Sequence, residues 1–508
     1  MQYETVWPTR TLRHARFGWI LLGLLLALTL PACAGHSSGT KPTLPANPIR
    51  LQIACPNPLL EQMLGHFGKL WPGRDRVQWQ LSTYDPAAAW PESDVLVLAA
   101  SDVPAAVLAG RAAPVPERLT SEQSSTNWRG VSHLLRTRLC VWDGKVYALP
   151  LVGGGVVVVY RKDVYAEAKH RAAYQARCQR ELAAPRTWEE FVEQAEYFRD
   201  ALGRPSLPGQ PAAPLVRAAE FNRIAANFVV SPVSESRFRQ RNPTEAEVRA
   251  MFSFHFDIDT GQSRLETAGF VRALQLQRRL DHCRPDAKQS KRDEFRTGQA
   301  VLAVVNLAEL SQLAEPGNAC TGKFALTPLL GSEQVATVEG DRLVANSQPT
   351  AMPTVGDAVF CAVVRPGLDD AAQTEAFDFL AWLSSPPPEG KAIEIVSQPI
   401  WGAGPWRDLQ LDASRRAIWN AYNLDATNTT LLIDSLRQQL APAIVNPVLC
   451  LRVPDARERL VILGEELTND PQRPPAQTLA AVNARWQTLD RRVDGPTRIR
   501  QIRQAAGL

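Results

Sequence analysis

The chain has 508 residues, 45% of them hydrophobic and 21% charged, which is the composition of an ordinary globular protein with enough length for two or three hydrophobic cores. Its formal net charge is +4, and the first 32 residues carry three arginines against one glutamate, so the remainder has a charge of +2. This even balance excludes the concentrated basic face of a nucleic-acid-binding protein.

The N-terminal segment has the pattern of an export signal. Three arginines between residues 10 and 16 precede an uncharged apolar run at 17–30, which is shorter than the roughly 20 residues that cross a bilayer as a helix. The following Leu-Pro-Ala-Cys at 30–33 resembles the lipobox of bacterial lipoproteins. The resemblance implies that residues 1–32 are removed as a signal peptide and that Cys33 is lipidated. Retention of the segment as an uncleaved anchor is the alternative, and both place the remaining chain outside the cytoplasm.

Residues 33–48 are rich in Gly, Ser, Thr and Pro and lack apolar periodicity, which predicts a lipidated tether. Seven scattered cysteines follow, with no CxxC and no metal-type spacing: Cys55, Cys140, Cys178, Cys283, Cys320, Cys361 and Cys450. Their odd number leaves at least one free thiol. An oxidising compartment permits one or two long-range disulfides, whose partners the sequence does not assign, and buried free thiols are the simpler interpretation.

Strand-like and helix-like segments alternate from residue 49 onward. The apolar run at 94–100 is typical of a parallel strand covered on both faces. Thr187 and Glu190 form a predicted capping box at the start of a helix. The alternation predicts an α/β architecture with mainly parallel sheets. The predicted strands are 49–54, 94–100, 145–151, 156–160, 300–305 and 358–364, and the predicted helices are 59–67, 187–198, 267–280 and 375–383.

Six short motifs, in order along the chain, resemble those of the extracellular solute-binding proteins of sugar-type ABC importers. They are DGKVYALP at 143–150, YRKDVY at 160–165, PRTWEEF at 185–191, FRTGQA at 295–300, FDFLAWL at 377–383 and LAAVNARW at 479–486. Each motif alone is weak, but they follow the lipobox at 30–33 in family order, over roughly 450 residues in all, and together they are a specific signal. Where the family often carries Asn-Gly-Pro-Trp, only Asn306 matches.

The resemblance implies a two-lobed periplasmic-binding-protein-like fold of type II, with discontinuous lobes joined by hinge strands. The expected first lobe combines residues 49–153 with 305–356, and the second combines 154–304 with 357–508. The expected crossings are 153–155, 304–306 and 355–357, and glycine at two of them suits a hinge whose dihedral angles change as the lobes close.

Ligands of open α/β sheets lie beyond the carboxyl ends of the strands, which selects Asn57, Ser101, Asp102 and Asn306 as ligand-binding candidates. Their short polar side chains suit sugar hydroxyls, although capping of the next helix is the alternative for Asn57 and Asp102.

Aromatic side chains form a second group of candidates. Trp401 and Trp406 flank a Gly/Pro loop from which an indole can stack on a pyranose ring, with packing in a core as the alternative. Tyr84 and Tyr147 are weaker candidates of the same kind. Gly154 and Asp357, at two of the expected crossings, complete the predicted ligand-binding residues.

The predicted function is capture of a small polar solute, expected to be a carbohydrate, by an extracytoplasmic lipoprotein that delivers it to the membrane subunits of an ABC importer. We expect a monomer that is held at the membrane by its lipid anchor, without enzymatic activity, cofactor, metal or nucleic-acid partner. The sequence has no HExxH or GxSxG motif, and the acidic segment at 257–261 fails the EF-hand pattern because Gln262 and Ala268 occupy its Gly and Glu positions. The alternatives are a secreted carbohydrate-active lipoprotein enzyme and a structural envelope lipoprotein.

Overall fold

The computed structural model describes residues 48–209, 213–229, 244–285, 294–337, 339–346, 349, 351, 352, 354, 359–441 and 451–508. The predicted signal peptide, Cys33, most of the tether and the expected crossing at 355–357 lie outside these residues. Within the described part of the chain, no helix combines the length and apolar character that a membrane span requires.

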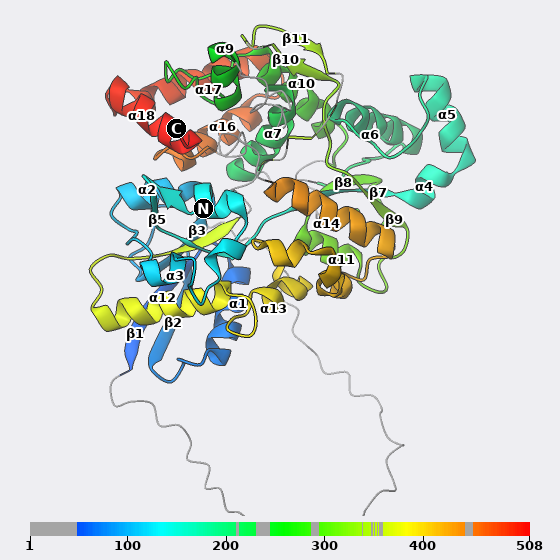
Figure 1. Ribbon diagram of the computed structural model, residues 1–508. Coiled ribbons are helices and arrows are strands. Elements are labelled where there is room, and N and C mark those ends of the chain that lie inside the picture. The colour runs from blue at the N-terminus through cyan, green and yellow to red at the C-terminus, as the bar shows by residue number, and fades with distance from the viewer. Residues whose placement is uncertain are drawn as a thin grey trace, which may run out of the picture. The chain divides into compact units, whose positions relative to one another are not determined.

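The first lobe contains a five-stranded sheet with the order β2-β1-β3-β12-β6, drawn in blue, cyan and yellow in Figure 1. β1 runs parallel to β2 and β3, whereas β12 runs antiparallel to β3 and β6. Helices α1 and α12 pack against this sheet. The bounds are β1 Ile49–Cys55, β2 Val77–Thr83, β3 Val95–Ala99, β6 Leu149–Val152, β12 Phe360–Val364, α1 Pro58–Leu70 and α12 Asp370–Ser384.

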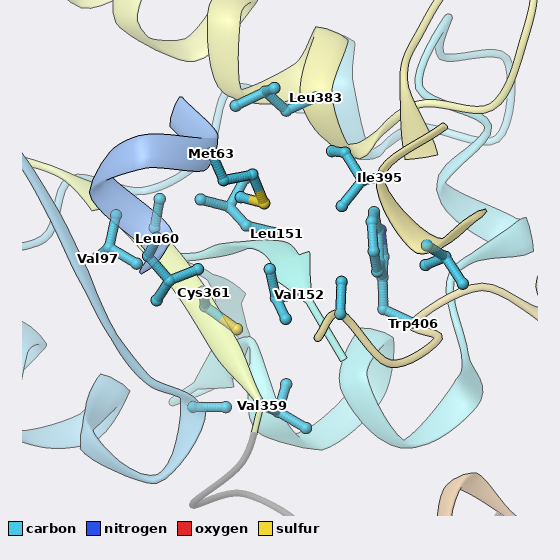
Figure 2. Packing of buried hydrophobic residues seen from close by; sticks show 14 of the residues in the cluster. Leu60, Met63, Val97, Leu151, Val152, Val359, Cys361, Leu383, Ile395 and Trp406 are labelled. Atoms are coloured by element: carbon cyan, nitrogen blue, oxygen red, sulfur yellow. The ribbon is translucent and has the colours of Figure 1, made fainter. Parts of the chain in front are cut away.

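The core of the first lobe follows from the apolar periodicity of these elements. Four of the five residues of β3 are buried, as expected for a strand covered on both faces, and α1 buries Leu60, Met63, Leu64 and Phe67 on one side. Figure 2 shows Leu60 and Met63 close to Leu151, with Trp406 and Ile395 at the other end of the same core.

The second lobe contains a three-stranded antiparallel sheet with the order β8-β7-β9. Side chains of β7 alternate between two cores, because Val157 and Val159 pack with the first core and Val158 with the second. The bounds are β7 Val156–Arg161, β8 Leu302–Asn306 and β9 Phe324–Thr327.

The second core is otherwise helical. Helix α7 is central to it because both α10 and α16 pack along it. The helices are α5 Ala168–Cys178, α6 Trp188–Leu202, α7 Pro214–Val229, α10 Ala268–Asp281, α16 Ala456–Asn469, α17 Pro475–Asp490 and α18 Gly495–Ala506. The remaining elements are α2 Val103–Leu108, α3 Glu117–Thr120, β4 Val141–Trp142, β5 Lys145–Val146, α4 Lys162–Ala166, α9 Glu245–Phe252, α11 Leu307–Leu313, β10 Gln334–Ala336, β11 Leu343–Ala345, α13 Ala392–Ser397 and α14 Ala426–Leu440.

The expected helices and strands are present, except that the expected strand 145–151 is divided into β5 and β6 of different sheets, and three expectations about their arrangement are wrong. The sheets are not mainly parallel, since only β1–β2 and β1–β3 pair in that direction among the described strands. β12 pairs within the first sheet although it was assigned to the second lobe, and β9 pairs with β7 although it was assigned to the first. Residues 304–306 are not a crossing, because the chain returns from β8 to the same sheet at β9. An apolar run indicates burial but not the strand beside which it will lie.

Residues 153–155 do connect the two sheets, from the end of β6 to the start of β7. Gly153 and Gly404 exchange two backbone hydrogen bonds of 3.0 and 2.7 Å. A Cβ atom on Gly153 would overlap the carbonyl oxygen of Pro405, and one on Gly155 would overlap the side chain of Leu436. Glycine is therefore required at this crossing by close packing of the backbone.

Candidate functional site

A cavity of about 520 Å³ is lined by residues of both lobes. It lies beyond the carboxyl ends of the parallel strands β1, β2 and β3, where an α/β sheet places its ligands. Five of the ten predicted ligand-binding residues line it: Asn57, Tyr84, Ser101, Asp102 and Asn306.

Asn57 and Asn306 each cap a helix as well as lining the cavity. Asn57 Oδ1 accepts a 2.9 Å hydrogen bond from the N–H of Leu60, and Asn306 Oδ1 accepts one of the same length from the N–H of Glu309. These caps fix both side chains through their oxygens, and neither amide nitrogen donates a hydrogen bond within the described part of the chain. Two rigidly held amide donors are thus available to a ligand.

Asp102 is the buried carboxyl group on the first-lobe side of the cavity, and Arg457 of α16 reaches it from the second lobe. The distance from Arg457 Nη2 to Asp102 Oδ2 is 3.5 Å. The same guanidinium donates to the carbonyl oxygen of Ala88 at 2.9 Å and lies 5.1 Å from the ring centroid of Trp90. Burial raises the pKa of Asp102, and the positive charge of Arg457 opposes this effect only in part. Arg457 therefore joins the two lobes at the cavity.

Tyr84 lies beside this pair and is held by one hydrogen bond. Its hydroxyl donates to the carbonyl oxygen of Val97 at 2.8 Å, and burial raises its pKa. The hydroxyl stays protonated at neutral pH, so its oxygen can still accept a hydrogen bond from a ligand.

Trp188 and Phe191 of α6 form an aromatic part of the cavity wall, with their ring centroids 5.8 Å apart in an edge-to-face arrangement. Trp188 is only 3% exposed, and its indole Nε1 has no hydrogen-bond partner among the described residues. The helix begins as predicted, because the Thr187 hydroxyl accepts from the N–H of Glu190 at 3.2 Å, although Glu190 itself accepts from the N–H of Arg186. The sequence places Trp188 in the PRTWEEF motif at the start of a predicted helix and gives no indication that it lines a cavity.

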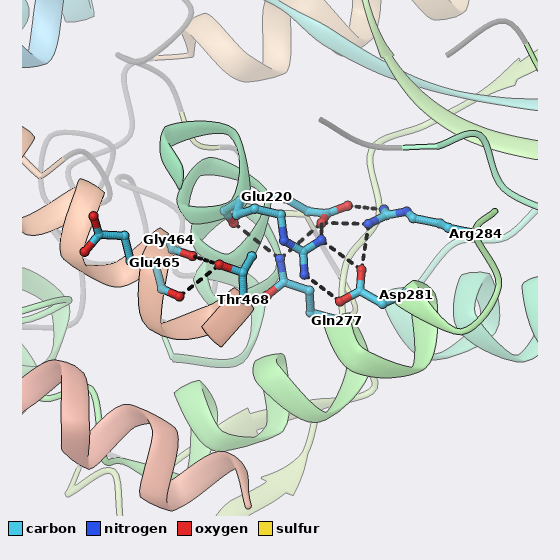
Figure 3. A network of polar contacts seen from close by, with 8 residues as sticks. Glu220, Gln277, Asp281, Arg284, Gly464, Glu465 and Thr468 are labelled. Atoms are coloured by element: carbon cyan, nitrogen blue, oxygen red, sulfur yellow. Dashed lines mark hydrogen bonds and ion pairs between the residues drawn. The ribbon is translucent and has the colours of Figure 1, made fainter. Parts of the chain in front are cut away.

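A buried network of charges forms another part of the second-lobe wall (Figure 3). Glu220 Oε2 accepts from Arg284 Nη1 at 3.1 Å and from Gln277 Nε2 at the same distance, while Asp281 accepts from Arg217 at 2.8 and 2.5 Å. Burial alone would raise the pKa of Glu220, but the guanidinium groups of Arg284 and Arg217 outweigh it and lower that pKa to about 2. The network keeps Glu220 and Arg284 ionised and fixed in place at the cavity.

The other predicted ligand-binding residues do not line the cavity. Trp406 is fully buried in the first core, which corrects its assignment as a stacking platform (Figure 2). Trp401 lies against His66 and Phe67, with ring centroids 5.7 and 6.3 Å away, and packs there. Tyr147 packs against both cores, and the carbonyl of Gly154 lies against Gly404. Asp357 lies outside the described residues.

A family model described as bacterial extracellular solute-binding protein matches residues 74–397, which is more than half of the chain. The chain belongs to this family. The matched residues include Tyr84, Asp102, Trp188 and Glu220 of the cavity wall. A comparison with curated proteins finds no match.

Solved structures similar to this solute-binding protein share its fold at low sequence identity. A ribitol complex of an ABC transporter solute-binding protein from Agrobacterium radiobacter has a TM-score of 0.61 at 14% identity and covers 87% of this chain and 100% of its own. Maltose-bound MalE3 of T. maritima has a TM-score of 0.58 at 16% identity with the same coverage. A chitin oligosaccharide binding protein has a TM-score of 0.59 at 15% identity and covers 87% of this chain and 98% of its own. These similarities establish the two-lobed fold.

The described part of this solute-binding protein contains no group of three or more His, Cys, Asp and Glu side chains placed to hold a metal ion. The polar atoms at the cavity are amide, hydroxyl, carboxylate and guanidinium groups, which form hydrogen bonds with hydroxyl-bearing solutes. Three charged residues of the wall, Glu220, Arg284 and Arg457, lie outside the six motifs recognised in the sequence.

Proposed function

We propose that this protein captures a carbohydrate or polyol in the cavity between its lobes and delivers it to the membrane subunits of an ABC importer. One observation carries the proposal: a cavity of about 520 Å³ whose wall combines fixed amide and carboxyl groups of the first lobe with Trp188 and Phe191 of the second. Small-molecule sites have volumes of about 300–1,000 Å³ and are mainly apolar with a few placed polar groups. The ligands named for similar structures, ribitol, maltose and a chitin oligosaccharide, have the same hydroxyl chemistry.

The polar groups of the cavity suit the hydroxyl groups of a sugar. Hydroxyl groups can accept from the amide nitrogens of Asn57 and Asn306 and donate to Asp102, while Trp188 and Phe191 form an apolar part of the wall. Because these residues come from both lobes, a bound solute connects the lobes, which favours their approach.

Binding is tested by isothermal titration calorimetry and thermal shift with ribitol, mannitol, maltose and chitin oligosaccharides. A ligand that binds only the folded state raises the melting temperature by mass action. Trp188→Phe removes the unpartnered indole N–H while keeping most of the ring, so we expect about a 2- to 10-fold weaker affinity, equivalent to one hydrogen bond. Trp79→Phe is the matched control, because it removes an equally unpartnered N–H in the first lobe away from the cavity. Equal affinities for the two variants, or no response to the panel, would count against this site.

Chromatography of the incubated solutes separates the proposed binder from its alternatives. Unchanged solute supports a binding protein, whereas cleaved oligosaccharide would indicate a carbohydrate-active enzyme. A structural envelope protein would bind none of the panel.

The remaining parts of the proposal concern location and assembly. The protein works outside the cytoplasm as a monomer held by lipid on Cys33, and Cys33→Ser should move it from the membrane fraction to the soluble fraction. Recovery of the variant in the membrane fraction would contradict the lipid anchor, and size-exclusion chromatography checks the monomer.

A further inference from the structure

Two cysteines that are distant in the sequence meet in the core of the first lobe. Cys140 immediately precedes β4, and Cys361 lies in β12, the strand between β3 and β6. Their Sγ atoms are 3.7 Å apart although the residues are 221 positions apart in the chain. Both side chains are fully buried. Among the described cysteines, this is the one pair whose sulfur atoms are in contact.

We infer that Cys140 and Cys361 form a disulfide bond when the chain folds outside the cytoplasm. The two thiols lose two protons and two electrons as the S–S bond forms, and a protein or small-molecule disulfide accepts them and becomes a pair of thiols. The sulfurs must approach by about 1.7 Å to reach the bond length of about 2.05 Å. The inference rests on the extracytoplasmic location in the proposed function but not on the identity of the solute.

The position of the pair gives the bond a structural role. Both sulfurs lie in the first core, whereas the chain between them leaves for β7, β8 and β9 of the second lobe and then returns to β12. A bond here would close a loop containing the whole intervening part of the second lobe. Cross-links that close long loops remove the most conformational freedom from the unfolded chain, so this bond would stabilise the first lobe while leaving the lobes free to move relative to each other.

Burial determines when the bond can form. No surface of either sulfur is available to an oxidant once the core has closed, and the hydrogen bond to Cys140, together with burial, raises the pKa of Cys361 and disfavours the reactive thiolate. Oxidation must therefore occur during folding. A chain that folds in a reducing environment should keep both thiols even when it is later exposed to air.

Peptide mapping of the full-length protein exported with its own leader tests the pairing. Free thiols are blocked with N-ethylmaleimide in denaturant, and the unreduced protein is digested and analysed by mass spectrometry. We expect the peptides containing Cys140 and Cys361 to be linked, with Cys55 and Cys283 blocked as free thiols. Blocked thiols at both Cys140 and Cys361, or linkage of either to another cysteine, would overturn the inference.

A second test does not depend on export: the purified protein is refolded from denaturant in the presence of glutathione disulfide. A linked pair after refolding supports the disulfide even if the protein is found in the cytoplasm. The cytoplasmic finding would refute only the proposed extracytoplasmic location. Refolding in dithiothreitol instead of glutathione disulfide should then give a lower melting temperature for the wild type and for Cys283→Ala, which lacks another buried cysteine, but an unchanged one for Cys361→Ala. If Cys361→Ala does not fold, peptide mapping of the refolded wild type still decides the question.

Discussion

Replacement of Arg457 by methionine tests whether contacts between the lobes control solute binding. Arg457 comes from α16 of the second lobe, and its guanidinium contacts Asp102, the carbonyl of Ala88 and the ring of Trp90, all in the first lobe. Methionine keeps much of the apolar stem but removes the charge and all its hydrogen-bond donors. Asp102 would then remain as a buried carboxyl group without its cation.

The size of the effect follows from the burial of this ion pair. Removing one partner of a buried pair costs about 3–5 kcal/mol, and the lower end applies because the Asp102 and Arg457 side chains keep 12% and 19% exposure at a separation of 3.5 Å. Water can replace the bond to Ala88, which is exposed. A loss of about 3 kcal/mol corresponds to about a 100-fold shift toward the open form. If the solute binds the closed form, its apparent dissociation constant rises by up to the same factor.

Titration calorimetry with the solute found in the panel measures this factor, and small-angle X-ray scattering of the unliganded protein measures the radius of gyration. Arg365→Met is the matched control, because Arg365 pairs with Asp94 at 2.8 Å within the first lobe. We expect weaker binding and a larger radius for Arg457→Met and wild-type values for Arg365→Met. Wild-type affinity in Arg457→Met, or an equal loss in the control, would refute the reasoning.

Three further predictions concern stability. Gly153→Ala should lower the free energy of unfolding, measured by urea titration, by about 1–3 kcal/mol because the added Cβ would overlap the Pro405 carbonyl. In the control Gly495→Ala the added Cβ meets no atom within 4 Å, so equal urea midpoints for the two variants would contradict this packing. Arg407→Met should lower the free energy of unfolding by about 3 kcal/mol or more in the same assay, because the buried guanidinium donates to the carbonyls of Thr126, Asn127 and Ser384. A wild-type urea midpoint would show that these hydrogen bonds are dispensable. Burial lowers the pKa of His255 from about 6.5 to about 3, so the neutral ring contributes stability that is present above pH 6.5 and is lost as the pH falls toward 3. Between pH 7 and pH 5, His255→Gln should lose less stability than the wild type, and equal losses would show that His255 does not cause the loss at low pH.

Much of the local structure is predictable because it depends on neighbours in the sequence. Helix α1 begins at Pro58 after the cap Asn57, and α6 begins after the cap Thr187, as their residue patterns indicate. Polar residues after strands were also a useful guide, since Asn57, Ser101, Asp102 and Asn306 all line the cavity. The order of the short motifs indicated the family, and the match of the family model to residues 74–397 confirms it.

The sequence alone therefore determined several of the strands and helices, the starts of α1 and α6, the family and part of the cavity wall. Tertiary structure decided that β12 inserts between β3 and β6, that Trp406 is a core residue, and that Arg457 reaches Asp102 across 355 positions of the chain. The physical reason is the range of the interactions. Periodicity and capping involve residues within about one or two helical turns, whereas strand partners, ion pairs and cavity walls join segments whose proximity exists only after the chain has folded.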